Sequence, residues 1–188
     1  MHYESLSRII VGFDKSTGNN GVVTLRQLPK VWSYMKNMKI WVDADACPKP
    51  VKEILYRVAD RTEILLTFVA NQRMRLPDSP FIQMIQVGQG EDVADDEIAF
   101  KCEAGDLIIT SDIPLAARVV EKGALALDPR GKVYDKNNIG QILSMRNFMD
   151  ELRGCGVETG GPRGFGHKER FKFANELDKY IATHGGTK

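Results

Sequence analysis

Acidic side chains stand directly after three apolar segments of the chain, at points where strands are predicted to end. Asp43 and Asp45 follow the first segment, Asp112 follows the second and Asp128 the third. In an open parallel sheet, ligands bind outside the carboxyl ends of the strands. Carboxylates collected there repel one another unless a cation lies among them. The pattern therefore predicts a site for a hard divalent metal ion.

A fourth acidic cluster opens a predicted helix. Asp92 shares a helical face with Asp95 or Asp96, because residues three and four apart are neighbours on a helix. Hydrolysis of a phosphodiester by two metal ions needs a few carboxylates that hold Mg²⁺ or Mn²⁺ about 3.5–4 Å apart. Oxygen atoms are the ligands that these hard ions prefer. This cluster, together with Asp43 and Asp112, is a candidate for such a site.

Each of these carboxylates also has a simpler structural interpretation. Asp92 is a suitable N-cap, its two acidic neighbours on the helix complement the helix dipole, and Asp112 can cap the helix that follows it. Capping does not require Asp43 and Asp45 together, nor acidic clusters at several strand ends. The set of carboxylates is therefore more informative than any single member.

A second enzyme class is compatible with the first acidic pair. A strand followed by Asp-x-Asp also opens the haloacid-dehalogenase-like phosphatases. There Asp43 would be the nucleophile and Asp45 the acid/base, Thr110 or Ser111 would contact the phosphate, and Lys132 would be the lysine. Those enzymes place their acidic metal-binding pair after the lysine, whereas this chain has its acidic pair before Thr110. A phosphatase is therefore the minor alternative.

The composition limits the class of protein and its compartment. The chain has 188 residues, of which 43% are apolar and 27% charged, as in a globular domain. No apolar run approaches the ~18 residues that span a membrane, and three cysteines without close pairs argue against a disulfide framework. We expect a cytoplasmic protein with no membrane partner. Residues 153–188 carry seven basic and four acidic residues, a balance that suits a polyanionic partner.

Strands and helices alternate from residue 38 onward. This alternation predicts a mainly parallel sheet covered by helices, an α/β fold in one domain over residues 38–188. Residues 1–37 are interpreted as an extension, either non-essential or the result of a start assigned too early. The expected strands are 39–42, 63–70, 81–87, 106–110 and 124–127, and the expected helices are 48–58, 92–103, 113–122, 138–152 and 167–183. In the last two helices, Phe148 and the stripe of Phe171, Ala174, Leu177 and Ile181 are expected to face the core.

Basic and polar residues near the same sheet edge are candidates for nucleic-acid contacts. Asn71 ends the second predicted strand, and Arg130 and Lys132 follow the fifth. A glycine-rich loop and the start of the last helix add Arg163, Lys168 and Arg170, with Phe165 available to stack on a base. The alternatives are a turn residue at Asn71, a solvated turn after the fifth strand, and a plain connection to a packing helix.

Several longer motifs make a resemblance specific. They are Val42-Asp43-Ala44-Asp45-Ala46-Cys47-Pro48, Ala70-Asn71, Gly90-Glu91-Asp92-Val93-Ala94-Asp95, Thr110-Ser111-Asp112-Ile113-Pro114-Leu115-Ala116, Arg130-Gly131, Met149-Asp150, Thr159-Gly160-Gly161-Pro162 and Phe171-Lys172-Phe173-Ala174-Asn175-Glu176-Leu177-Asp178. In this order, over about residues 38–182, they resemble the YaiI/YqxD family of uncharacterised bacterial proteins. That family looks like a member of the PIN-like nuclease superfamily, whose fold is a three-layer α/β/α sandwich.

The resemblance implies a metal-dependent nuclease acting on RNA, or on DNA. It implies Mg²⁺ or Mn²⁺ at Asp43, Asp92, Asp95, Asp96 and Asp112. The same resemblance assigns catalysis to Asp43, Asp45, Asp95 and Asp112. PIN-like nucleases often carry one more acidic residue farther along the second helix, and no equivalent is assigned in this chain. The alternative from another class is a non-catalytic protein that binds nucleic acid or metal and has retained the fold.

Overall fold

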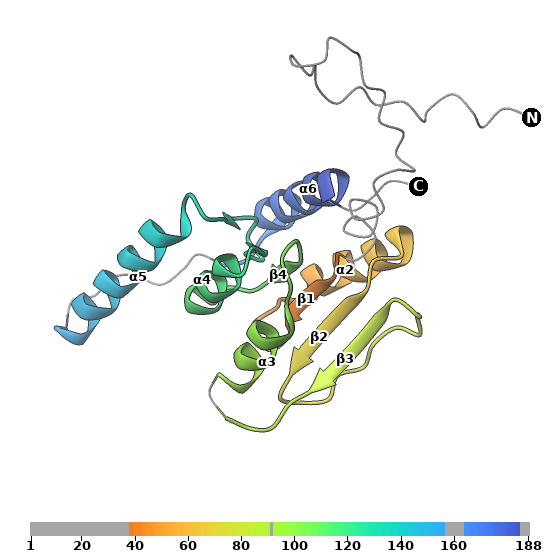
Figure 1. The fold of residues 1–188 in the computed structure, drawn as a ribbon, viewed down its shortest axis with the longest axis horizontal. Helices are drawn as coiled ribbons and strands as arrows, with labels where there is room; N and C mark the ends of the chain where they lie inside the picture. Colours follow the sequence, from red (N-terminus) through yellow and green to blue (C-terminus); the bar gives the residue numbers. More distant parts are fainter. Residues whose placement is uncertain (1–37, 91, 157–163, 185–188) are drawn as a thin grey trace, which may run out of the picture. The chain divides into compact units, whose positions relative to one another are not determined.

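Among the residues that the structure describes, six strands form a single sheet in the order β3-β2-β1-β4-β5-β6, and β1 to β4 are labelled in Figure 1. The computed structural model describes residues 38–90, 92–156 and 164–184. The chain divides into two units, Met1–Asn37 and Met38–Lys188, and the described fold is that of the second unit. The extension proposed for residues 1–37 lies outside the described residues.

The strands and helices alternate along most of this unit. Its elements are β1 (Ile40–Asp43), α2 (Lys49–Thr62), β2 (Leu66–Ala70), β3 (Ile82–Gln86), α3 (Val93–Lys101), β4 (Leu107–Ile109), α4 (Ile113–Glu121), β5 (Leu125–Leu127), β6 (Val133–Tyr134), α5 (Ile139–Gly154) and α6 (His167–His184). Strands β1 to β5 pair in parallel, and β6 pairs antiparallel to β5. The expected mainly parallel α/β sheet is thus confirmed.

The strand order changes direction between β1 and β4. From β1 the chain adds β2 and β3 on one side, and then returns to place β4 and β5 on the other. The segments that leave β1 and β4 therefore diverge at the carboxyl edge of the sheet. A crevice at such a reversal is where open α/β sheets bind ligands.

Helices cover both faces of the sheet. Successive strand residues point to opposite faces, so neighbouring residues of one strand pack in different apolar clusters. Ile40 and Val42 of β1 lie in one apolar cluster with α2 and α6, whereas Trp41 lies in a second cluster with α3, α4 and the start of α5. The fold is therefore a three-layer α/β/α sandwich, as expected.

The core face predicted for α6 is confirmed at Leu177 and Ile181, which are buried, and at Ala174, which packs against the core, but it is wrong at Phe171. Phe171 is 70% exposed, whereas Phe173 is fully buried together with Leu177. Two residues along a helix turn the side chain by about 200°, so the two phenylalanines point to opposite sides. Phe148 of α5, also expected to face inward, is 53% exposed. Both errors arise because an aromatic residue on a helix does not indicate by itself which face the sheet will cover.

Three local details also differ from the prediction. β6 was not expected, because two residues are too short to show an alternating pattern. β2 begins at Leu66 rather than at residue 63, because Glu63 adopts a left-handed conformation with φ 58° and ends α2. Asp92 occupies the N-cap position of α3, but its φ of 62° is left-handed and its side chain makes no capping hydrogen bond.

A buried carboxylate joins the amino ends of β1 and β4. Asp106 is 1% exposed and accepts hydrogen bonds from Lys39 N at 2.9 Å, Trp41 Nε1 at 2.9 Å and Glu103 N at 3.0 Å. With three donors, both oxygens of this buried carboxylate have hydrogen-bond partners from the protein, which indicates a structural role. It ties the start of β1 to the loop that leads into β4.

Removing this carboxylate should be costly for stability. The variant Asp106→Ala leaves an indole N–H and two backbone N–H groups without their acceptor, and each loss costs about 1–3 kcal/mol. We expect urea denaturation to show a loss of about 3 kcal/mol or more. As the control, Glu103→Ala removes only the exposed pair with Lys39 and should cost at most about 1 kcal/mol. Equal losses in the two variants would contradict the role given to Asp106.

Candidate functional site

Asp43 and Thr110 meet where the strand order reverses between β1 and β4, at the carboxyl edge of the sheet that we term the crevice. Asp43 is the last residue of β1 and is 7% exposed, and Thr110, which directly follows β4, is 1% exposed. The pairing of Val42 with Ile109 brings the next residues of both strands level. The Thr110 hydroxyl donates to Asp43 Oδ2 at 3.2 Å. The end of the central strand therefore holds a carboxyl group in a largely dry position.

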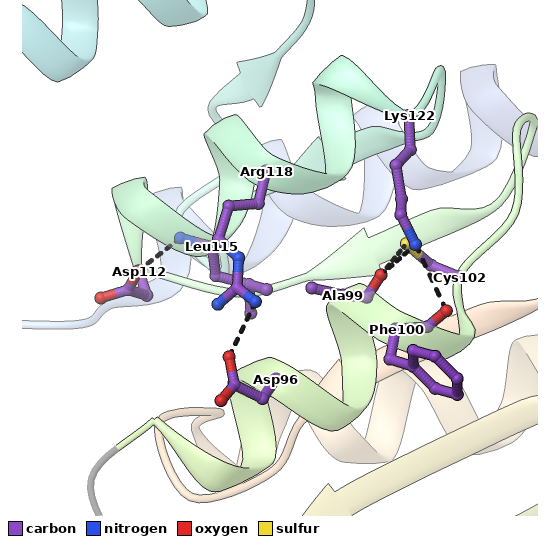
Figure 2. A network of polar contacts seen from close by, with 8 residues as sticks. All are labelled: Asp96, Ala99, Phe100, Cys102, Asp112, Leu115, Arg118 and Lys122. Atoms are coloured by element: carbon purple, nitrogen blue, oxygen red, sulfur yellow. Dashed lines mark hydrogen bonds and ion pairs between the residues drawn. The ribbon is translucent and has the colours of Figure 1, made fainter.

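Asp112 is held beside this pair by two hydrogen bonds. Its backbone N–H donates to Thr110 Oγ1 at 3.0 Å, and its Oδ1 accepts from Leu115 N at 2.7 Å (Figure 2). Asp112 is thus the N-cap of α4, as its structural interpretation required. Its Oδ2 takes no hydrogen bond from the described residues. Capping uses one oxygen of the carboxylate, and the other can serve a ligand.

Asp95 comes from α3, whose position is set by two contacts with α4. Arg118 of α4 pairs with Asp96 at 2.7 Å, and Lys122 donates to the carbonyl oxygens of Ala99 and Phe100 at the end of α3 (Figure 2). The cation of Lys122 also complements the negative end of the helix dipole. These contacts fix α3 beside the helix that begins with Asp112.

The carboxylates of Asp43, Asp95 and Asp112 interact electrostatically. The pKa of Asp95 is raised to about 7, first by burial and then by the charges of Asp43, Asp112 and Asp92, against a weaker opposing effect of Arg118. Burial also raises the pKa of Asp43, opposed by the hydrogen bonds from Thr110 and Ala46, whereas Asp45 and Asp112 add to the increase. Two of the three carboxyl groups are therefore poorly stabilised in their charged form without a cation.

The donor chemistry fits Mg²⁺ or Mn²⁺, but the spacing allows only part of the predicted ligand set. Within residues 38–90, 92–156 and 164–184, no three His, Cys, Asp or Glu side chains are arranged to hold one ion together. Mg²⁺ usually keeps several waters and binds proteins through one or two carboxylates. The site is therefore compatible with an ion held by one or two of these carboxylates, and not with one held by three of them in the arrangement described.

Asp45 and Asn71 lie on the β2 side of the crevice. Asp45 is exposed and its Oδ2 accepts from Asn71 N at 3.0 Å. Asn71 Oδ1 is buried and has no hydrogen-bond partner among the described residues. A buried amide oxygen without a donor is costly unless water or an ion completes it. The side-chain oxygen of Asn71 is thus available to a ligand at this edge, in addition to the carboxylate of Asp45.

The remaining predicted residues are spread over several places. Asp96 turns toward Arg118, Asp92 is exposed at the start of α3, and Arg163 lies outside the described residues. Lys168 is exposed at the start of α6, and Arg170 lines a cavity between α2 and α6. The two basic residues after β5 have different surroundings. The backbone N of Arg130 donates to Asp128 Oδ1 at 2.6 Å, whereas Lys132 Nζ lies 5.5 Å from the centre of the Tyr134 ring. Phe165 is half-buried against the core.

Two residues near the crevice, Arg118 and Tyr134, were not predicted as part of a site, whereas Thr110 was predicted to contribute a hydroxyl contact. The hydroxyl of Thr110 connects two of the carboxylates, and Arg118 orients α3. Tyr134 has its pKa raised to about 12, first by burial and then by Asp128 and Asp112. Thr110 lies two positions before Asp112 in the sequence, but Arg118 and Tyr134 carry no local signal. Their positions depend on helix packing and on a two-residue strand.

Comparisons with known proteins agree on one family. The model of the family described as "Uncharacterized BCR, YaiI/YqxD family" matches residues 41–183. A UPF0178 protein of Maridesulfovibrio salexigens is 60% identical over 144 residues, which cover 77% of this chain and 95% of that protein. A UPF0178 protein of Shewanella woodyi is 56% identical over 147 residues, covering 78% and 97%. No solved structure matches. Among the described helices, none combines the length and apolar character needed to cross a membrane.

The shifted pKa of Asp95 predicts how stability depends on pH. Its folded value of about 7 lies above the ordinary 3.8, so between these values the folded state keeps a proton that the unfolded chain releases. Stability is therefore lost as the pH rises through this window. In EDTA, Asp95→Asn should raise the free energy of unfolding by about 1 kcal/mol or more at pH 8, and by progressively less toward pH 4.

Urea denaturation at several pH values measures this difference. The neighbouring variant Asp96→Asn serves as the control, because it removes only the exposed pair with Arg118. We expect it to lower stability by at most about 1 kcal/mol. A gain for Asp95→Asn that is the same at pH 4 and pH 8 would show that carboxylate repulsion is not its cause.

Proposed function

The chain belongs to the YaiI/YqxD family, and from this membership and the geometry of the crevice we propose that it is a metal-dependent nuclease that hydrolyses phosphodiester bonds of RNA, or of DNA. The observation that carries the proposal is the convergence of Asp43, Asp95 and Asp112 at the reversal of strand order. They come from three separate elements, and their charges oppose one another. The resemblance to the PIN-like nuclease superfamily points to the same class of reaction.

In this proposal Asp43 and Asp112 hold Mg²⁺ or Mn²⁺, with Asp95 beside them. When bound, an ion of this kind activates water and offsets the charge of the phosphate. Thr110 keeps both ligands in place, since its hydroxyl donates to Asp43 and accepts from the backbone of Asp112. Asp45 and the free oxygen of Asn71 lie on the β2 side, where they can orient a water molecule or a phosphate.

Structural and catalytic roles can be separated at Asp112. Asparagine keeps the side-chain oxygen that caps α4, but removes the charge. We therefore expect Asp112→Asn to fold with nearly unchanged stability and to lose cleavage of labelled single-stranded RNA by about 100-fold or more, the scale of losing one stabilising group at a reaction centre. Asp43→Asn should behave in the same way. Cleavage is measured with Mn²⁺, with Mg²⁺ and with EDTA, on single-stranded RNA and DNA.

Asp60→Asn is the matched control, because Asp60 is an exposed carboxylate on α2 whose described partner is Ser79. It should cleave like the wild type. Equal and metal-independent cleavage by all variants would point to a contaminant and would contradict the proposal. If the wild type binds RNA without cutting it, the non-catalytic interpretation takes precedence. Hydrolysis of small phosphomonoesters with a phosphorylated Asp43 would instead support the phosphatase.

Metal binding should also be visible without any substrate. An ion that binds the folded state alone adds about 2.7 kcal/mol of stability at 100 times its Kd. Thermal unfolding should therefore shift upward with Mn²⁺ or Mg²⁺ relative to EDTA, and more strongly at pH 8 than at pH 6, because the proton on Asp95 competes with the ion. Asp43→Asn should lose most of this shift. An equal shift in Asp43→Asn and in the wild type would locate the ion elsewhere.

A further inference from the structure

A second feature of the surface lies between α2 and α6, in the helix layer on the opposite face of the sheet from α3 and α4. The two helices enclose a cavity of about 490 Å³. Its wall contains Arg57 and Arg61 from α2, and His167, Arg170 and Phe171 from α6. On each helix these residues are three or four positions apart, so they form two facing stripes. None of the carboxylates of the crevice takes part.

The charge of this cavity is positive. Arg61 is neutralised by Asp178 at 2.7 Å, and Asp178 is the acidic residue in the cavity wall. Arg57 and Arg170 form no ion pair within the part of the chain that the structure describes. Two guanidinium groups without a carboxylate, next to an imidazole, favour an anion, and guanidinium suits the geometry of phosphate.

An exposed aromatic ring completes the cavity. Phe171 is 70% exposed although Phe173, two residues away, is fully buried. A large apolar side chain left in water beside unpaired arginines has the elements of a site for single-stranded nucleic acid, where the phosphates meet cations and a base stacks on a ring. The bases of a duplex are already stacked on one another, so they cannot use Phe171 in this way.

Both helices start at the carboxyl edge of the sheet. α2 follows the end of β1 after a short turn. The first turns of α6 pack on the loop after β5, where a Cβ at Gly131 would lie 2.7 Å from Phe173 N. The pair between Arg61 and Asp178 joins the later parts of the helices, so α2 and α6 run in the same direction. The basic cavity therefore extends away from the edge that carries the acidic crevice.

We propose that the cavity between α2 and α6 is an auxiliary binding site for single-stranded RNA, in which Arg57 and Arg170 contact phosphates and Phe171 stacks on a base. This inference rests on the proposed function for the identity of the strand as a substrate. Binding at the cavity does not depend on the acidic crevice or on a metal ion. The auxiliary site would retain the strand while the crevice acts on it.

Binding in EDTA tests this site separately from cleavage. The probe is fluorescein-labelled oligouridylate, which has no stable secondary structure, and its anisotropy is followed at several salt concentrations. Arg57→Gln should weaken binding and reduce the slope of log K against log salt by about 0.7, the value for one phosphate contact on a single strand. Phe171→Ala should weaken binding about fivefold or more without changing the slope.

Arg146→Gln is the matched control, because it removes the same charge from α5, where Arg146 pairs with Asp150. It should leave the affinity and the salt slope unchanged. All three variants should keep the thermal unfolding of the wild type. Equal effects of Arg57→Gln and Arg146→Gln would reduce the binding to net charge and overturn the site. No binding by the wild type in EDTA, or stronger binding of a phosphopeptide or of duplex RNA, would also overturn it. RNA bound but never cut would contradict the nuclease proposal alone.

Discussion

The parallel pairing of β1 with β4 is the interaction on which the rest of the structure depends. Its register aligns Ile40 with Leu107 and Val42 with Ile109. The same alignment puts Asp106 next to Lys39 at one end of the pair and Thr110 next to Asp43 at the other. A shift of β4 by one residue would turn its side chains to the opposite faces of the sheet and separate Thr110 from Asp43. One set of backbone hydrogen bonds therefore positions a structural carboxylate and a candidate functional one.

These two buried carboxylates differ in how well the protein satisfies them. Asp106 accepts three hydrogen bonds, from two backbone N–H groups and an indole. Asp43 is stabilised by one hydroxyl and one backbone group, and it also faces the charges of Asp45 and Asp112. Burial is expensive for a charge that is not fully paired. Asp43 has fewer hydrogen-bond donors than Asp106 and faces two other carboxylates. This difference, and not its acidity or its place at a strand end, distinguishes the crevice as the candidate site for a cation.

The two charged features of the fold have complementary roles in the proposed chemistry. The acidic crevice needs a cation before it can approach a phosphate, since its carboxylates would otherwise repel the substrate. The basic cavity between α2 and α6 is proposed to attract the same polyanion without a cation. Contacts of Arg118 and Lys122 hold α3 against α4 on one face of the sheet, while the α2–α6 cavity lies on the other. The sheet separates the two features, so each can be altered without disturbing the other.

By itself the sequence determined the alternation of strands and helices, the parallel sheet and the collection of Asp43, Asp45 and Asp112 at its carboxyl edge. These features follow from local periodicity and from strand ends, which neighbouring residues encode. Only the tertiary structure decided which members of the acidic cluster meet. Asp95 lies within electrostatic reach of Asp43, whereas the next residue pairs with Arg118, 22 positions away. It also decided that Phe173 is buried and Phe171 exposed, because the two rings point to opposite sides of α6 and the packing partners decide which side is covered.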